Sequence, residues 1–213
     1  VWLARHGRTA YNAAGRFQGH LPVPLDDRGR EQAHQLAEAS ARLGGLVASP
    51  LARAWETAQI VGARLGLEPV EDARFAETDA GDWTDRTFED VIAQDPDGFA
   101  RFAALDLTWG FPGGERFADQ QARVLEGVAE WRARETVPPA RSPAGPVLVV
   151  CHGVTIRHDP VIGDPAGDQD ARALRIGHPS LVDPTIWTLR DQVQAFVGPN
   201  HAQIDRARAP RLG

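Results

Sequence analysis

Residues 1–12 read VWLARHGRTAYN, and this stretch decides the fold that the rest of the chain completes. A short apolar run ends in Arg5, His6 and Gly7, as in a buried strand that presents polar groups at its tip. Open parallel sheets place their chemistry at the carboxyl ends of the strands. The stretch therefore predicts an α/β domain with a functional site at residues 5–7.

A second stretch, residues 146–153 (PVLVVCHG), repeats this pattern. Its continuous apolar run is typical of a strand buried on both faces of a parallel sheet, and it ends in His152 and Gly153. Two adjacent parallel strands would bring His6 and His152 to the same edge of the sheet. We therefore predict a parallel sheet with both histidines in one site.

The remaining elements follow from apolar spacing and from turn residues. A helix is expected over 28–42, and a second one is expected to start at Ser49-Pro50 and to end at Gly66. Further predictions are a short strand at 46–49, a single polar helix at about 84–104, a helix at 117–134 and a late hairpin at 185–189 and 192–196.

Length and composition suit one domain over residues 1–197, with a small helical lid inserted at about 78–116 and a tail at 198–213. The chain has 213 residues, of which 42% are hydrophobic. Trp109 and Phe111, in the glycine-rich connector, look exposed. The side chains that could line the mouth of the site are Arg8, Arg16, Trp83, Arg86, Trp109, Phe111 and Arg116, and the alternative for each of them is packing in the lid or a solvated charge.

The net charge of −6 argues against nucleic acid or an acidic membrane as the partner. No apolar run approaches the ~20 residues that a membrane helix needs. We therefore expect a cytoplasmic protein whose partner is a small phosphorylated metabolite. The single cysteine, Cys151, offers neither an internal disulfide nor a metal framework. The oligomeric state stays open, with a homodimer as one alternative.

Two arginines can surround a tetrahedral dianion at the strand tips. Arg5 ends the first strand, and Arg53 lies in the first turn of a helix, where the positive end of the helix dipole also favours an anion. The backbone N–H groups of Gly7 and Gly153 add donors. A phosphate group is the ligand that this set predicts.

A neutral His6 imidazole could attack such a phosphate in line, with His152 as a further donor, to give a phosphohistidine that water then hydrolyses. The departing alkoxide needs a proton, and Glu77 is the candidate donor because burial beside an anion and under a lid raises a carboxyl pKa.

Other chemistries fit less well. His6, His20, His152 and His158 lack the His-x-x-x-His spacing of a zinc site, and Arg5 would repel a cation, so we predict neither a metal nor a cofactor. The glycines do not form a dinucleotide or nucleoside triphosphate loop, and no Gly-x-Ser-x-Gly elbow is present.

At this point the motifs resemble the histidine phosphatase superfamily, the phosphoglycerate mutase-like proteins. They occur in the family's order as RHGRTAYN (5–12), FQG (17–19), LDDRGREQA (25–33), SPLARAWETA (49–58), ETDAGDW (77–83), PGGE (112–115) and VVCHG (149–153). Within the family the chain is most similar to the broad-specificity phosphatase and α-ribazole phosphatase branch. After Gly153 the sequence departs from the family pattern, which continues with a second small residue and an apolar helix.

The resemblance implies an α/β/α fold of three layers with a mostly parallel central sheet. It also implies that His6 is phosphorylated, that Arg5, Arg53 and His152 form the phosphate pocket, and that Glu77 donates the proton. It also implies that Asn12 and Gln18 are polar contacts nearby, and we add Gly19 to this phosphate-binding set. A phosphomonoesterase that needs no metal is the leading reading. A mutase that returns the phosphoryl group to a bound acceptor is the alternative, followed by a phosphate-binding module without turnover.

Overall fold

The computed structural model describes residues 1–40, 42–136 and 145–157. Its sheet has four parallel strands in the order β1 (Trp2–Arg5), β4 (Val147–Cys151), β2 (Gly45–Ala48) and β3 (Val70–Glu71). Apolar residues fill β4 without a break, and all five of its residues are buried. The predicted parallel sheet is confirmed, and the second strand tip lies beside the first.

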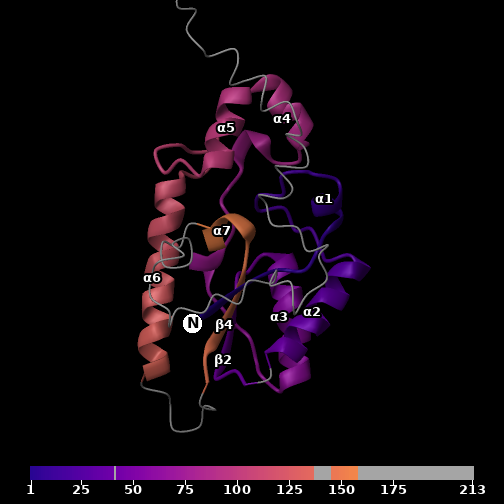
Figure 1. Ribbon diagram of the computed structural model, residues 1–213, viewed down its shortest axis with the longest axis vertical. Helices are drawn as coiled ribbons and strands as arrows, with labels where there is room; N and C mark the ends of the chain where they lie inside the picture. The colour runs from indigo at the N-terminus through magenta and orange to yellow at the C-terminus, as the bar shows by residue number, and fades with distance from the viewer. Residues whose placement is uncertain (41, 137–144, 158–213) are drawn as a thin grey trace, which may run out of the picture.

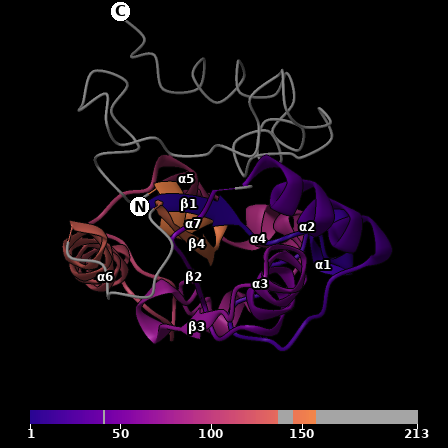
Figure 2. The ribbon, with the colours of Figure 1, turned by 90° about the horizontal axis from the view of Figure 1, so that it is seen from below.

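Helices cover both faces of this sheet (Figure 2). On one face α2 (Asp27–Ala39) and α3 (Ala52–Leu65) contact each other and enclose Leu148 and Val150 of β4. On the other face α6 (Phe117–Thr136) and the 3-10 turn η1 (Ala73–Phe75) cover Val147 and Val149. Successive residues of β4 therefore point into opposite layers, as strand geometry requires, and the three-layer prediction is correct.

The lid lies over the carboxyl ends of the strands (Figure 1). It contains the 3-10 turn η2 (Gly81–Trp83), α4 (Phe88–Gln94) and α5 (Pro96–Ala104), and the short helix α1 (Ala10–Ala13) lies below it. The lid has an aromatic core of its own, made of Phe17, Trp83, Phe88, Phe99, Phe102, Trp109, Phe111 and Phe117 together with Ala80, Val91 and Val154.

The prediction of one helix over 84–104 was wrong because the chain breaks at Asp95-Pro96. Proline lacks an N–H and disfavours helical backbone in the residue before it. Asp95 accordingly has φ −141° and ψ 67°, ends α4, and caps α5 by accepting from the N–H of Gly98. The two short helices can therefore fold over the aromatic core from different directions.

Other boundaries also shift. The first long helix ends at Ala39 rather than Arg42, and α3 begins at Ala52 because Leu51 is extended, so Pro50 precedes the helix. Despite the departure from the family pattern, α7 (Gly153–Arg157) follows β4 directly. The predicted hairpin at 185–189 and 192–196 and the tail at 198–213 lie outside the described residues.

Trp109 and Phe111, expected to be exposed, are 8% and 5% exposed. Their rings lie 4.9 Å apart and pack against Trp83 and Phe117, so they belong to the lid core. Within the described residues, no helix is both long and apolar enough to cross a membrane.

Candidate active site

The two strand tips meet as predicted. Arg5 pairs with Cys151 in the sheet register, and the N–H of His6 donates to the carbonyl of Cys151 at 3.0 Å. The rings of His6 and His152 lie 5.1 Å apart with a tilt of 57°. One sheet edge therefore holds both histidines, although they come from opposite ends of the described chain.

The hydrogen bonds of His6 fix its tautomer. Its Nδ1 lies 2.7 Å from the carbonyl oxygen of Gly7, which can only accept, so Nδ1 carries the proton and Nε2 keeps its lone pair. Burial, and then the charges of Arg53 and Arg5, hold the pKa of His6 well below its usual value. At neutral pH the ring is therefore uncharged, with a nucleophilic nitrogen at Nε2.

Arg53 connects the nucleophile to the loop above it. Its Nε donates to Nε2 of His6 at 3.3 Å, and its Nη2 donates to the carbonyl of Gly19 at 3.0 Å. The side chain is buried, and desolvation lowers its pKa to about 10, so it stays charged at neutral pH. Arg5 is partly buried, and desolvation lowers its pKa as well. The pocket therefore holds two desolvated cations beside the lone pair.

His152, whose ring contacts that of His6, is fully buried. Its Nε2 is 2.8 Å from the hydroxyl of Ser49, and its Nδ1 has no hydrogen-bond partner among the described residues. Burial and the nearby Arg53 and His6 hold its pKa well below the usual value. Ser49, at the end of β2, therefore orients this ring and leaves Nδ1 for another partner.

Gly7 has a packing role that its sequence position did not reveal. A Cβ at this position would come within 2.3 Å of the carbonyl oxygen of Gly29 in α2, so only glycine fits. Its N–H donates to the hydroxyl of Thr57 at 3.0 Å, and that hydroxyl donates to the carbonyl of Arg53. The contact of this N–H with an anion stays a prediction. At Gly153 a Cβ would lie 3.6 Å from Nε of Arg5.

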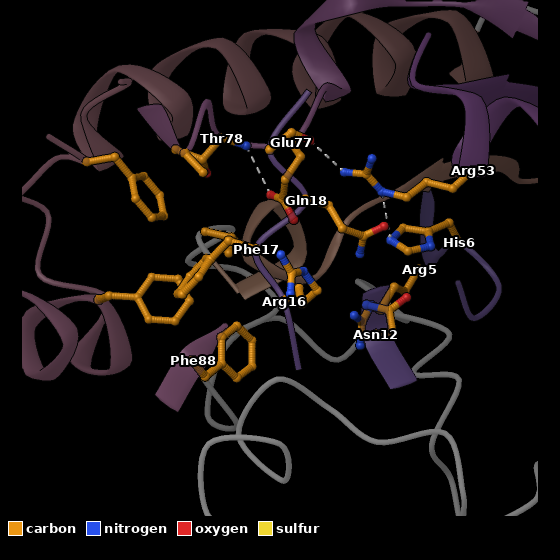
Figure 3. A pocket seen from close by; sticks show the side chains of 15 residues that line it. Arg5, His6, Asn12, Arg16, Phe17, Gln18, Arg53, Glu77, Thr78 and Phe88 are labelled. Atoms are coloured by element: carbon orange, nitrogen blue, oxygen red, sulfur yellow. Dashed lines mark hydrogen bonds between the residues drawn. The ribbon is translucent and has the colours of Figure 1, made fainter. Parts of the chain in front are cut away.

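Glu77 enters the pocket from the loop before η2 (Figure 3). Its Oε1 accepts from the backbone N–H of Thr78 at 3.0 Å and from the Gln120 amide at 3.4 Å. Burial raises the pKa of this carboxyl, against the opposing charges of Arg53 and Arg5. A half-buried carboxyl with a raised pKa keeps its proton to a higher pH than an ordinary carboxyl, which suits it to donate a proton.

Thr9 organises the two amide side chains of the site. Its hydroxyl lies 3.0 Å from Oδ1 of Asn12 and 2.9 Å from Oε1 of Gln18, and it also caps helix α1. Oδ1 of Asn12 also accepts from the backbone N–H of Thr9, so the NH₂ group of Asn12 remains as a donor. Asn12, Gln18 and Gly19 all line the pocket. Their contact with a phosphate stays a prediction.

The pocket has a polar end and an apolar end. Its lining consists of Arg5, His6, Asn12, Arg16, Phe17, Gln18, Gly19, Arg53, Glu77, Thr78, Ala80, Phe88, Phe102, Phe111 and Val154. Of the side chains proposed for the mouth, Arg16 and Phe111 are among them. Nε of Arg16 lies 3.1 Å from the carboxylate of Asp85, which also accepts from the hydroxyl of Tyr11. In the described part of the chain no group of three or more His, Cys, Asp or Glu residues is placed to hold a metal ion.

Arg123 of α6 holds the loop that carries Glu77, and sequence reasoning missed it. Its guanidinium pairs with Glu115 at 2.7 Å and donates to the carbonyls of Arg74, Ala76 and Glu77. Glu115 in turn accepts from the N–H of Asp79. The PGGE motif (112–115) therefore supports the candidate acid. No sequence signal distinguishes Arg123 from a solvated helix charge.

His6 and His152 are buried at the strand ends of a parallel sheet, with the partly buried Arg5 beside them and the buried Arg53 in the first turn of α3. This arrangement defines an α/β protein with a cationic pocket. Residues 1–159 match the model of the histidine phosphatase superfamily (branch 1). The chain belongs to this superfamily.

Several relatives support this assignment. Glucosyl-3-phosphoglycerate phosphatase of Mycobacterium tuberculosis (strain ATCC 25618 / H37Rv) is 41% identical over 155 residues, which span 71% of this chain and 69% of the relative. The mycobacterial enzyme solved as a complex with VO3 aligns with a TM-score of 0.65 and 38% identity, over 73% of this chain and 77% of that one. The α-ribazole phosphatase of Shigella flexneri aligns with a TM-score of 0.59 and 30% identity, over 72% and 74%.

We expect Arg123→Gln to lower kcat on alkyl phosphates by about 10- to 100-fold, because small displacements of a catalytic group carry costs of that order. The loss should be smaller on p-nitrophenyl phosphate, whose leaving group needs little help from an acid. A defect that only disturbs the fold would instead lower kcat equally on both substrates. Steady-state kinetics on the two substrates measure this. Arg134→Gln, which removes an exposed ion pair of the same helix with Glu130, is the control and should behave like the native chain.

Proposed function

We propose that this chain is a metal-independent phosphomonoesterase in which Nε2 of His6 takes the phosphoryl group. The observation that carries the proposal is the state of His6: its proton is held on Nδ1 by Gly7, and its lone pair faces Arg53. The superfamily membership and the phosphatase names of the relatives support the same activity.

In the first step Nε2 of His6 forms a bond to phosphorus while the bond from phosphorus to the ester oxygen breaks. Arg5 and Arg53 stabilise the charge on the equatorial oxygens, and Nδ1 of His152 is the proposed further contact. Asn12 and Gln18 are the proposed amide donors. Glu77 protonates the departing oxygen, so an alcohol leaves.

In the second step water attacks the phosphohistidine. Glu77 is now a carboxylate and takes a proton from this water, which is the reverse of its first role. The bond from phosphorus to Nε2 breaks, and inorganic phosphate and neutral His6 are restored. Every proton in this cycle moves through groups that line the pocket.

The proposed substrate is a small phosphorylated sugar or sugar acid. The substrate named for the mycobacterial relatives, glucosyl-3-phosphoglycerate, belongs to this class. The pocket has an apolar end beyond Glu77, which suits contact with the carbon skeleton of the leaving alcohol. The net charge of −6 supports a dissolved metabolite, rather than nucleic acid, as the partner, and we propose the cytoplasm as its place of action.

Release of inorganic phosphate tests the activity. The native chain is incubated with EDTA and p-nitrophenyl phosphate, glycerol phosphate, 3-phosphoglycerate or glucosyl-3-phosphoglycerate, and His6→Ala made in the same way controls for contaminating phosphatases. We expect turnover that survives EDTA and is absent from the variant. Isomerisation of 3-phosphoglycerate without phosphate release would instead show a mutase. Binding of phosphate without either reaction would show a silent module.

A further inference from the structure

Thr78 carries a buried hydroxyl at the pocket that the proposed mechanism does not use. Its side chain is 1% exposed, and Oγ1 has no hydrogen-bond partner among the described residues. A buried hydroxyl without a partner is costly, so such groups are rare in folded proteins and call for an explanation. Thr78 lines the pocket, where a bound substrate can supply the missing partner.

The position of Thr78 places it where it would contact the leaving group of the substrate rather than the phosphate. Its backbone N–H holds Oε1 of Glu77 at 3.0 Å, which places it next to the proposed acid. In Figure 3 Thr78 lies on the side of Glu77 that faces away from Arg53 and His6. A phosphate bound at His6 therefore has its ester oxygen near Glu77 and its carbon skeleton near Thr78.

The surroundings leave few competitors for this contact. The apolar end of the pocket is lined by Phe17, Ala80, Phe88, Phe102, Phe111 and Val154, none of which has a polar side chain. Arg16 is the charged group on this side, and Asp85 already engages it through both Nε and Nη2. The Thr78 hydroxyl is thus the group that a polar leaving group would meet in an otherwise apolar wall.

We propose that Thr78 is a specificity-determining residue, and that its hydroxyl bonds an oxygen substituent on the carbon next to the ester carbon of the substrate. The inference rests on the proposed function and narrows it to polyol and sugar phosphates over simple alkyl phosphates. A site with a hydroxyl that lacks a partner discriminates against an analogue without the matching group, because that analogue leaves the hydroxyl unpaired.

The matched substrates are glycerol 1-phosphate and n-propyl phosphate, which differ only in hydroxyl groups. The measured quantity is kcat/KM for glycerol 1-phosphate divided by kcat/KM for n-propyl phosphate. We expect Thr78→Val to lower this ratio by about tenfold, the loss that one net hydrogen bond supports. Valine keeps the branched shape and the N–H that holds Glu77. Thr78→Ser, which keeps the hydroxyl, should restore the ratio.

Ser40→Ala is the control variant. Ser40, at the end of α2, has a buried hydroxyl that also lacks a partner among the described residues, but it does not line the pocket. Both Thr78→Val and Ser40→Ala should raise the melting temperature, because each removes an unsatisfied buried group. Only Thr78→Val should change the substrate ratio.

An unchanged ratio in Thr78→Val would overturn the proposal, and so would an equal loss on both substrates, which would show that Thr78 acts only through Glu77. If the native chain hydrolyses neither substrate, the proposed function fails. The specificity is then measured as the ratio of dissociation constants of the two phosphates for the native chain and for Thr78→Val. A ratio that the substitution does not alter would again reject the contact.

Discussion

Replacement of His6 by alanine should lower phosphate release by a factor on the order of 10⁴ or more, because no other group can take the place of a covalent nucleophile. In the native chain, rapid quenching during turnover of a ³²P-labelled substrate should trap label on the protein. The label should resist alkali and be lost in acid, as expected for a phosphorylated imidazole. Mass spectrometry of the peptide that contains His6 identifies the site.

A matched histidine controls for non-specific labelling. His34 is exposed on α2 and does not line the pocket, so His34→Ala should be labelled and should turn over like the native chain. Label that persists in His6→Ala would refute the assignment of the nucleophile. Label found on His152 instead would show that His152 is the nucleophile and that His6 is the supporting residue.

Replacement of Glu77 by glutamine should lower kcat on alkyl phosphates by about 10²- to 10⁴-fold, the usual range for loss of a general acid. The loss should be much smaller on p-nitrophenyl phosphate, because p-nitrophenolate leaves without a proton. A plot of log kcat against leaving-group pKa should therefore be steeper for the variant than for the native chain. Equal slopes would show that another group supplies the proton.

The pH profile gives a second test of Glu77. In the native chain the acid form must be present, so kcat/KM falls as the pH rises through the pKa of Glu77, which burial raises above its ordinary value. The pKa of His6 is lowered, so the nucleophile is lost only well below the usual value of about 6.5 for an imidazole. In Glu77→Gln the fall of kcat/KM at high pH should disappear, while the fall at low pH, which reports His6, should remain.

Strand tips were the most predictable part of this molecule. The short apolar runs that end at His6 and His152 are typical of strands, and the continuous apolar composition of residues 147–151 accounts for the burial of β4 on both faces. Parallel pairing of the two strands then places the histidines together. The family motifs added the proposed roles of Asn12 and Gln18 as phosphate contacts, which spacing alone does not reveal.

Tertiary contacts explain what the sequence did not show. The exposure of Trp109 was mispredicted because glycines surround it and no periodicity marks a buried face, whereas its burial comes from rings distant in the chain. The guanidinium of Arg123 and the hydroxyl of Ser49 act through partners on other elements. Such contacts depend on how the helices and the sheet pack together, which local sequence patterns do not indicate.

The strand order also sets the time at which the pocket can exist during synthesis. β4 is the last described strand to leave the ribosome, yet it lies between β1 and β2 and forms their common hydrogen-bonded neighbour. A nascent chain that ends before Val147 can form neither the continuous sheet nor the pair of histidines. Because such non-local pairing is slow to form, the emerging half-sheet exposes unpaired edges. The polypeptide therefore acquires its anion pocket only after nearly all of the described chain has been translated.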